Sequence, residues 1–379
     1  MKNVLKYTAL GLASGIALTY AFGYDYLFKG VAKTYLKGES GATIDDADLF
    51  PQHIISKGNP RPWVHDSLYN KLSLTKTLEE DLKKSNTAAF LVARDGRLLH
   101  EQYWNGYTAT SQTNSFSMAK GVTALLLGAA IMDGKISSEN ALYSEFYENY
   151  RNVPYGDKLS LKHLVTMEAG LDWDEDYKNP FKPNAKAYYG NSLAKAVLLR
   201  GFKTTPGTEF EYQSGSTQLL GFALRKVTNI PLADFASARL WKPLGMEQHA
   251  LWTVDDNEME KTFCCIHSNA RDFAKLGQLM LEDGKVDSLQ VIPFDYIEKM
   301  RTPTAHSKGA YGYGLWINNE VKNKHYYFLG LYGQYIIVVP EKKLVIVRTG
   351  MYKNLPKDEK GRPFQVNTIV DEVVKMTEK

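Results

Sequence analysis

Residues 113–128 read Thr-Asn-Ser-Phe-Ser-Met-Ala-Lys-Gly-Val-Thr-Ala-Leu-Leu-Leu-Gly, with a Ser-x-x-Lys pair, Ser117 and Lys120, at the head of an apolar run. On a helix, residues three apart share a face, so the Lys120 amine would lie beside the Ser117 hydroxyl. A nucleophile and its base need this arrangement. The apolar run predicts a buried helix with an exposed start, and burial favours a neutral lysine that can accept the serine proton.

Two other Ser-x-x-Lys pairs occur in the chain, Ser73 with Lys76 and Ser192 with Lys195. Their neighbours are charged and amphipathic, which is typical of surface helices with solvated lysines. The spacing alone is a weak signal, so the choice depends on this context. We therefore expect the chemistry at residues 113–128.

The composition sets broad limits. The chain has 379 residues, of which 44% are hydrophobic, and a formal net charge of +4. A sizeable core is available, in one large domain with an insertion or in two domains. No basic stripe with interleaved aromatic residues occurs, so nucleic acid is not an expected partner. The histidines are scattered and no zinc-type spacing is present, so we expect no metal and no cofactor.

The N-terminal segment carries a long uncharged run, residues 7–24, preceded by Lys2 and Lys6. Such a run predicts an export signal or a membrane anchor within residues 1–30. Flanking lysines favour a cytoplasmic start, so the folded body would lie on the periplasmic or cell-surface side. We slightly favour an uncleaved anchor, because residues 21–23 are a weak cleavage site. A buried N-terminal helix of a cytosolic protein is the alternative.

The two cysteines are neighbours, Cys264 and Cys265. A bond between neighbours closes a strained eight-membered ring, so we expect free thiols. His267 lies two residues further on and would permit a nucleophilic role. Packing beside a helix start is the interpretation that we favour.

The remaining chain divides into two parts. Residues 31–76 are polar and rich in Pro and Gly, which predicts a linker that wraps the body and buries Trp63 and Tyr69. Residues 77–379 begin with a short helix and a hairpin around Asp95-Gly96, continue with a mostly helical region over about 117–300, and end with strands and a closing helix. Helices are expected over 77–84, 159–167, 192–199, 216–226, 232–240, 269–282 and 366–376, and strands over 88–94, 98–103, 313–317, 325–329, 335–339 and 344–348.

This order predicts an α/β (α+β) fold with one antiparallel sheet flanked by helices. The helical region would be inserted between the N-terminal and C-terminal strands, which places Ser117 at the junction. Clefts between such lobes commonly hold ligands. Two downstream segments are candidates to complete the site: Tyr212 and Ser214 on a turn before a helix, and the Gly-bounded strand start at residues 330–334.

Taken in this order, the motifs resemble the serine β-lactamase and penicillin-binding-protein superfamily. Ser-Met-Ala-Lys matches Ser-x-x-Lys, Tyr212-Gln-Ser214 takes the place of Tyr-x-Asn, and Leu331-Tyr-Gly333 takes the place of Lys/His-Thr-Gly. The sequence over residues 164–177, 240–246 and 269–277 is most similar to that of the class C-like esterases and the 6-aminohexanoate-dimer (nylon oligomer) hydrolases. The resemblance covers about residues 85–375 and implies a β-lactamase/transpeptidase-like fold.

The resemblance also implies roles for individual residues. Ser117 would be the nucleophile, Lys120 its base and Tyr212 a second acid/base. The backbone N–H groups of Ser117 and Gln334 would form the oxyanion hole. Substrate-facing positions would be Tyr177, Ser214, His267, Leu331 and Gly333.

Two positions depart from the family pattern. Ser214 replaces the asparagine that usually holds a substrate amide, and Leu331 replaces the cation that usually grips a substrate carboxylate. Losing one charge-assisted contact weakens binding by roughly 1.5–3 kcal/mol, about ten- to a hundredfold. Penicillins and D-Ala-D-Ala peptides carry that carboxylate, so they are poorer candidates than small esters and linear amides.

The sequence therefore predicts an exported serine hydrolase that cleaves esters or linear amides through an acyl-enzyme. Two alternatives stay open. One is a β-lactamase or D-alanyl-D-alanine carboxypeptidase, and the other is a non-catalytic protein that binds cell wall or peptide. The natural substrate and the oligomeric state are left open.

Overall fold

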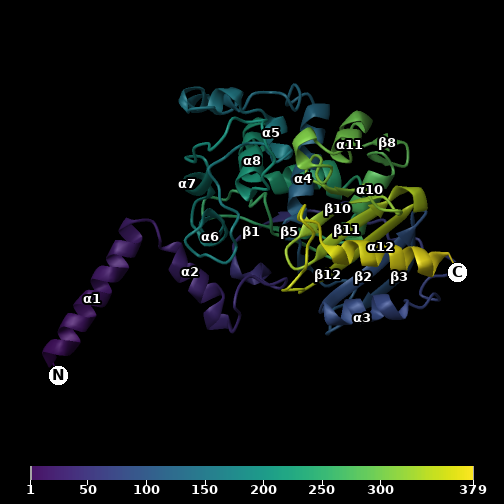
Figure 1. Cartoon of the computed structure of the whole chain (residues 1–379), viewed down its shortest axis with the longest axis horizontal. Coiled ribbons are helices and arrows are strands. Elements are labelled where there is room, and N and C mark those ends of the chain that lie inside the picture. The colour runs from purple at the N-terminus through teal and green to yellow at the C-terminus, as the bar shows by residue number, and fades with distance from the viewer. Residues whose placement is uncertain (1, 379) are drawn as a thin grey trace.

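The computed structural model describes residues 2–378 and contains an antiparallel six-stranded sheet at its centre (Figure 1). The strand order is β3-β2-β12-β11-β10-β9, so N-terminal and C-terminal strands pair through β2 and β12. The hairpin around Asp95-Gly96 and the C-terminal strands are confirmed. The strands are β2 (Thr87–Arg94), β3 (Arg97–Tyr103), β9 (Trp316–Asn318), β10 (His325–Gly330), β11 (Gln334–Val339) and β12 (Leu344–Gly350).

Both faces of this sheet are covered by helices. Side chains alternate along β2, so Leu91 packs in the cluster shared with α4 and α10, whereas Phe90 packs in the cluster shared with α3 and α12. Gly277 permits close packing, because a Cβ there would lie 2.5 Å from Val345 Cγ1. The helices are α3 (Lys76–Lys84), α4 (Met118–Met132), α10 (Ala270–Leu281) and α12 (Phe364–Thr377).

The helical region lies between β3 and β9, as expected. Every expected helix is present, and most ends lie within a few residues of the predicted bounds. The additional helices are α5 (Leu161–Val165), α6 (Pro183–Tyr189), α7 (Leu193–Val197), α8 (Ser214–Thr228), α9 (Leu232–Ala236) with a π-helical turn (Ser237–Trp241), and α11 (Phe294–Met300). Of these, α6 and α11 were not predicted.

The expectation of a single sheet is wrong. A second sheet has the order β1-β5-β6-β4, and a separate hairpin joins β7 to β8. The strands of this second sheet are two to four residues long, too short for an alternating pattern to be recognised. The strands are β1 (Gln52–Ile55), β4 (Thr113–Asn114), β5 (Ala250–Thr253), β6 (Ile266–Ser268), β7 (Lys285–Val286) and β8 (Leu289–Gln290).

The segment over residues 31–76 wraps the body. Its strand β1 pairs with β5, and Trp63 and Tyr69 pack against the main core. The Trp63 indole also donates a hydrogen bond to the Arg271 carbonyl at 2.9 Å. This segment therefore belongs to the folded body.

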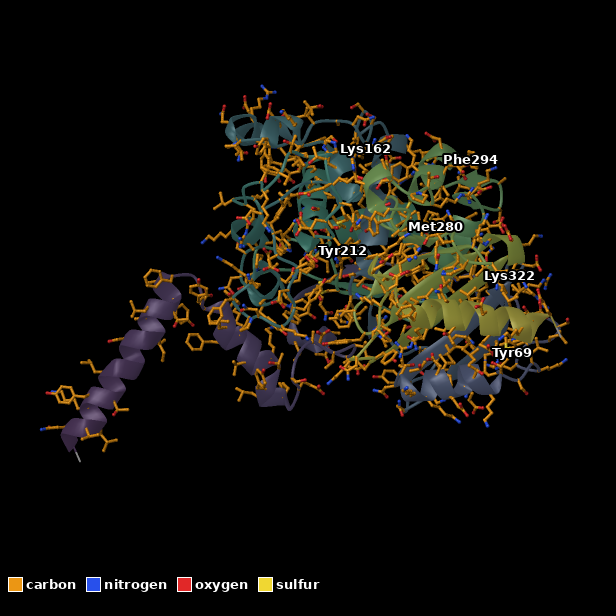
Figure 2. All side chains as sticks on the ribbon, in the orientation of Figure 1. Tyr69, Lys162, Tyr212, Met280, Phe294 and Lys322 are labelled. Atoms are coloured by element: carbon orange, nitrogen blue, oxygen red, sulfur yellow. A yellow bond between two sulfur atoms is a disulfide. The ribbon has the colours of Figure 1, made fainter. Side chains whose placement is uncertain are left out.

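The N-terminal helix α1 (Lys2–Ala21) extends away from the body, and its side chains project from a helix that stands apart (Figures 1 and 2). Among its apolar side chains, Leu10 and Ile16 are exposed. The next helix, α2 (Tyr26–Lys33), packs against α6 through Gly30 and Tyr189. Within residues 2–378 no helix combines the length and the apolar character that crossing a bilayer requires. The membrane anchor and export both stay predictions.

Candidate active site

Ser117 and Lys120 meet at the start of α4. Ser117 occupies the N-cap position and is partly exposed, whereas Lys120 is 2% exposed in the first turn. Lys120 Nζ lies 2.9 Å from Ser117 Oγ. The serine is therefore open to a ligand while its partner amine is enclosed.

The other two Ser-x-x-Lys pairs are arranged differently. Ser192 caps α7 by accepting a hydrogen bond from the Lys195 backbone N–H at 3.3 Å. The Lys76 side chain is 90% exposed. Neither serine has a lysine amine as a hydrogen-bond partner among the described contacts, which fits their interpretation as surface features.

The neighbours of Lys120 determine what its amine can do. Besides Ser117, Nζ contacts Ser214 Oγ at 3.1 Å and the Phe263 carbonyl oxygen at 3.0 Å. The carbonyl can only accept, and the Ser214 hydroxyl already donates to Glu175 at 2.5 Å. A neutral amine therefore donates its two N–H groups to Ser214 Oγ and the Phe263 carbonyl oxygen. Its lone pair then faces the Ser117 hydroxyl.

The pKa of Lys120 suits this role. Burial lowers it to about 8, and the negative charge of Glu175 partly opposes the shift. A large fraction of the amine is therefore neutral at mildly alkaline pH. A group with such a pKa can take a proton from a serine and return it to a leaving group.

Glu175 is part of the site, and the sequence analysis did not identify it. It accepts hydrogen bonds from the Ser214 backbone N–H at 2.7 Å, the Trp173 indole at 2.7 Å and the Tyr177 hydroxyl at 2.5 Å. Together with the Ser214 hydroxyl, these donors satisfy both carboxylate oxygens and fix the direction of the Ser214 proton. The only signal in the sequence is one acid among several in residues 172–176.

Tyr212 lies beside Lys120. Its ring centre is 4.9 Å from Lys120 Nζ, and Trp316 packs against it at 5.5 Å between ring centres. Burial raises the pKa of Tyr212, and a hydrogen bond with Ser117 offsets a part of this rise. The phenol therefore stays protonated near neutral pH and can donate a proton.

Two adjoining cavities, of about 500 and about 380 Å³, meet at Ser117. Both are also lined by Tyr177, Leu331 and Tyr332. Tyr177 is 54% exposed, yet its hydroxyl turns inward to Glu175. The structure thus brings the expected Ser117, Tyr177 and Leu331 to one groove.

Two positions expected at the groove, Gly333 and Gln334, line neither cavity. Gly333 has a φ of +81°, and a Cβ there would lie 2.6 Å from the guanidinium of Arg348, so this glycine serves the turn. The Gln334 side chain binds the backbone of Gly350 at 2.7 and 2.9 Å. The oxyanion role of the Gln334 N–H stays a prediction, and Leu331 is the turn residue that reaches the groove.

His267 also lies away from the groove, against the expectation that it faces substrate. It is fully buried in β6, and its Nε2 is 3.8 Å from Asp46 Oδ1. Burial lowers the pKa of His267 to about 4, so the ring is neutral. Within residues 2–378 no group of three or more His, Cys, Asp or Glu side chains is arranged to hold a metal ion.

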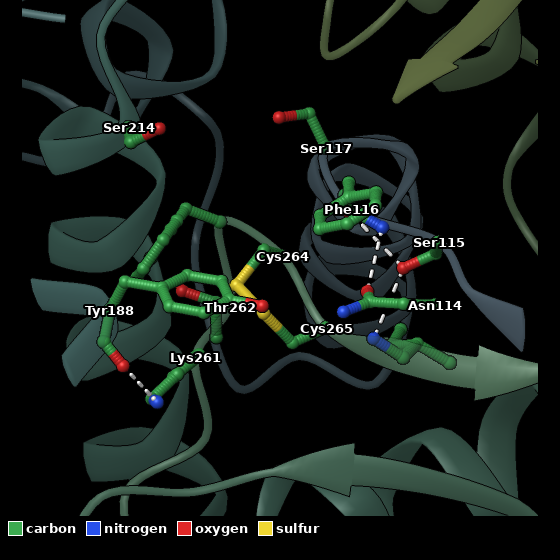
Figure 3. Close-up of a disulfide and its surroundings, with 12 residues drawn as sticks. Asn114, Ser115, Phe116, Ser117, Tyr188, Ser214, Lys261, Thr262, Cys264 and Cys265 are labelled. Carbon is green, nitrogen blue, oxygen red and sulfur yellow. Dashed lines mark hydrogen bonds between the residues drawn. A yellow bond between two sulfur atoms is a disulfide. The ribbon is translucent and has the colours of Figure 1, made fainter. Parts of the chain in front are cut away.

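Cys264 and Cys265 are not free thiols; they form a disulfide (Figure 3). The expectation failed because Cys265 adopts a φ of +73°, a turn conformation that local sequence did not indicate. Cys264 lines the same cavity as Ser117 and Ser214. The disulfide therefore borders the groove directly after Phe263, the residue whose carbonyl contacts Lys120.

Comparisons with known proteins agree with this geometry. The family model described as Beta-lactamase matches residues 74–364. The 6-aminohexanoate-dimer hydrolase of Paenarthrobacter ureafaciens is 25% identical over 331 residues, which cover 79% of this chain and 82% of that protein.

Two solved structures share the fold. One is described as "Putative 6-aminohexanoate-dimer hydrolase from Bacillus anthracis", with a TM-score of 0.74, 22% identity and coverage of 91% of this chain and 92% of that chain. The other is a penicillin binding protein from Bacillus halodurans, with a TM-score of 0.62, 15% identity and coverage of 79% and 99%. The family match spans most of the chain, so this protein belongs to the beta-lactamase family of serine hydrolases.

Proposed function

We propose that this protein cleaves esters or linear amides through an acyl-enzyme on Ser117. The observation that carries the proposal is the contact of Lys120 Nζ with Ser117 Oγ at 2.9 Å, beside two further oxygens at 3.0 and 3.1 Å. Ser214 and Phe263 take both N–H groups of the neutral amine, so its lone pair faces the Ser117 hydroxyl. This is the arrangement that an activated serine requires.

The reaction runs in two halves. Lys120 takes the Ser117 proton as Oγ bonds to the substrate carbonyl carbon, and the ammonium or the Tyr212 phenol protonates the departing alcohol or amine. Water then attacks the ester carbonyl on Ser117 and gives a proton to the group, Lys120 or Tyr212, that protonated the leaving group. The acid is released as Ser117 Oγ regains a proton. The Ser117 backbone N–H, at the start of α4, supports the negative oxygen.

The walls of the groove and the relatives support the substrate class. Leu331 offers no charge where the family pattern has a cation, and Trp316, Tyr212 and Phe210 give the larger cavity an apolar wall. The similarity to a 6-aminohexanoate-dimer hydrolase supports linear amides in particular. A β-lactamase or D-alanyl-D-alanine carboxypeptidase activity is the second candidate, weakened by Leu331.

The test is pre-steady-state hydrolysis of p-nitrophenyl butyrate by the full-length protein, with intact mass measured during turnover. We expect a burst of p-nitrophenol and an acyl adduct, both lost in Ser117→Ala and both kept in the control Ser192→Ala. A protein that binds the ester without burst, adduct or turnover in any form would instead be a non-catalytic binder.

A further inference from the structure

The residue before the nucleophile has an unusual backbone. Phe116 adopts a φ of +43°, in the left-handed region that a bulky side chain rarely occupies. Such a conformation persists only where the surrounding contacts hold it. Phe116 leads directly into Ser117, the N-cap residue of α4. The contacts that hold Phe116 therefore also set the position of the Ser117 hydroxyl.

Asn114 supplies a polar contact that holds Phe116. Its side-chain Oδ1 accepts the Phe116 N–H at 2.8 Å (Figure 3). Asn114 is 1% exposed, and the other end of its amide, Nδ2, donates to Asp46 Oδ1 at 2.8 Å. A carboxylate oxygen only accepts, so Asp46 fixes which end of the amide faces Phe116. Without this acceptor the amide could turn over and present its NH2 group to the Phe116 N–H.

Asp46 is held by a second donor, on a wall of the groove. The Tyr188 hydroxyl, from α6, donates to Asp46 Oδ2 at 2.5 Å, and Tyr188 lines the smaller cavity at Ser117. Asp46 is 2% exposed, and burial raises its pKa, while the hydrogen bonds from Tyr188 and Asn114 oppose the rise. Both carboxylate oxygens have a donor, so Asp46 joins the loop before the nucleophile to α6.

The charged neighbours of Asp46 do not take over this role. His267 Nε2 lies 3.8 Å from Asp46 Oδ1, too far for a hydrogen bond, and the low pKa of His267, about 4, leaves its ring neutral. The Lys261 amine donates to the Tyr188 carbonyl instead. Asp46 therefore acts through two neutral donors, an amide and a phenol.

Asp46 belongs to the segment that wraps the body, and this segment meets the same loop at further points. The Ile44 carbonyl accepts the Asn114 N–H at 2.8 Å, and the Ile44 side chain packs in one buried cluster with Phe116. Residues 40–42 line the smaller cavity. The wrapping segment thus reaches the active site through its backbone and through its side chains.

We propose that Asp46 is a positioning residue for the nucleophile. It orients the Asn114 amide, which holds the backbone of Phe116 and thereby sets the place of the Ser117 hydroxyl beside its base. The inference rests on the proposed hydrolase function and adds to it. Asp46 acts on the rate of Ser117 acylation without touching the reacting atoms.

The test removes these hydrogen bonds and then restores them with the charge moved. Asn114→Ala deletes the acceptor of the Phe116 N–H, whereas Asp46→Ala deletes only the group that orients the Asn114 amide. The exchanged pair is Asp46→Asn/Asn114→Asp. Its new amide at position 46 can donate to the new carboxylate at position 114, which still accepts the Phe116 N–H. The amide oxygen at position 46 accepts the Tyr188 hydroxyl, so all three bonds are kept.

Asn323→Ala is the matched control. Asn323 is 8% exposed and also donates its amide to a carboxylate, that of Asp371, at 2.8 Å, but it lines neither cavity at Ser117. Stopped-flow bursts at a series of p-nitrophenyl butyrate concentrations separate the rate constant of acylation from the dissociation constant of the ester. Near-UV circular dichroism and Tm report folding. A role in stability alone would lower Tm and leave the acylation rate constant of the folded protein unchanged.

We expect Asn114→Ala to lower the acylation rate constant about ten- to a hundredfold, and Asp46→Ala about three- to tenfold. The dissociation constant of the ester should stay within about twofold of wild type, because a misplaced nucleophile slows the chemical step and not the binding. The exchanged pair and Asn323→Ala should acylate within about threefold of wild type.

Acylation within about threefold of wild type in both single alanine variants at positions 46 and 114 refutes the positioning role. An exchanged pair that folds yet acylates as slowly as Asn114→Ala refutes it too, as does a loss confined to the dissociation constant. If Asn114→Ala does not fold, Asp46→Ala and the exchanged pair decide by the same criteria. A wild type that forms no Ser117 adduct refutes the hydrolase, and the positioning role falls with it.

Discussion

Two lysines of this protein are equally buried, yet their surroundings give them different chemistry. Lys120 is 2% exposed and Lys261 is 1% exposed. Burial lowers the pKa of Lys120 to about 8 and that of Lys261 to about 7. By burial and basicity alone, Lys261 would be the better candidate for a neutral base.

The difference lies in what each amine contacts. Lys261 Nζ donates to the Tyr188 carbonyl at 2.5 Å and lies 4.0 Å from the centre of the Phe50 ring. Neither neighbour has a proton to give. Lys120 instead faces the hydroxyl of Ser117, which is exposed to a cavity. Burial thus supplies a neutral amine, and the hydroxyl of Ser117 within hydrogen-bond distance gives that amine a proton to accept.

The largest expected effect comes from removing each lysine in turn. Lys120→Met should lower the rate of Ser117 acylation on the order of 10³-fold or more, because the serine loses its base. Lys261→Met should stay within about threefold of wild type, since its amine reaches no reacting group. Burst kinetics with a p-nitrophenyl ester measure both, with near-UV circular dichroism as the control for folding. A folded Lys261→Met that loses acylation as completely as Lys120→Met would break the distinction.

A smaller effect is expected from Glu175→Gln. Wild-type acylation should fall as pH drops through about 8, because protonation of Lys120 removes its lone pair. Glu175 raises that pKa, so its neutralisation should move the acid limb to lower pH, while weaker orientation of Ser214 lowers the maximal rate roughly tenfold. Profiles of kcat/KM over about pH 5.5–9.5 test this.

Asp174→Asn is the matched control for Glu175→Gln. Asp174 lies in the same acidic run but pairs with Lys182, away from the lysine base. Its acid limb should coincide with that of wild type. An acid limb in Glu175→Gln that stays in place or moves to higher pH would show that Glu175 does not act on Lys120.

The disulfide offers a third test, because it lies in a segment that includes Lys261 and contacts Lys120. Residues 261–265 carry Lys261, the Phe263 carbonyl that binds Lys120, and the Cys264–Cys265 bond. Reduction by a dithiol adds two electrons and two protons to the sulfurs and frees the segment. We expect acylation to fall by about three- to tenfold, the worth of one hydrogen bond.

Intact mass reports the gain of two hydrogens alongside the rate. Cys264→Ala/Cys265→Ala is the control, in which the dithiol should have no effect. Full reduction in the mass spectrum without a change in acylation would show that the Phe263 carbonyl keeps its place without the bond.

Local sequence predicted the parts of the site that depend on local geometry. Ser117 and Lys120 are three residues apart on one helix, so their contact follows from helical spacing, and the long strands β10–β12 follow from their apolar runs. Glu175 could not be found this way, because its partner Ser214 lies 39 residues further along the chain and several acids surround it. Its role depends on the tertiary fold.

The errors have the same origin. The strands of the second sheet are too short to show a period, and β4 and β6 of that sheet hold Asn114 and the buried His267 side by side. Gly333 resembled a ligand-facing glycine but packs against the buried Arg348. In each of these places a long-range contact decides the outcome, and residue type alone does not report it.

The smallest expected effect concerns stability. It tests whether the buried amine of Lys261 makes the free energy of unfolding depend on pH. The pKa of Lys261 is about 7 in the folded protein and near 10.5 when unfolded. The unfolded state therefore binds more protons between these values, so this lysine costs stability below pH 7 and the cost is relieved as pH rises toward 10.5. Wild type should gain free energy of unfolding from pH 7 to about 9.5, by up to about 3 kcal/mol from this group. In Lys261→Met that part of the rise should vanish, whereas the exposed control Lys324→Met should retain it, as measured by urea unfolding at both pH values. An equal rise in the free energy of unfolding of wild type and Lys261→Met would mean that the Lys261 amine is solvated in the folded state. Lys120 and Lys261 would then differ in burial as well as in their neighbours.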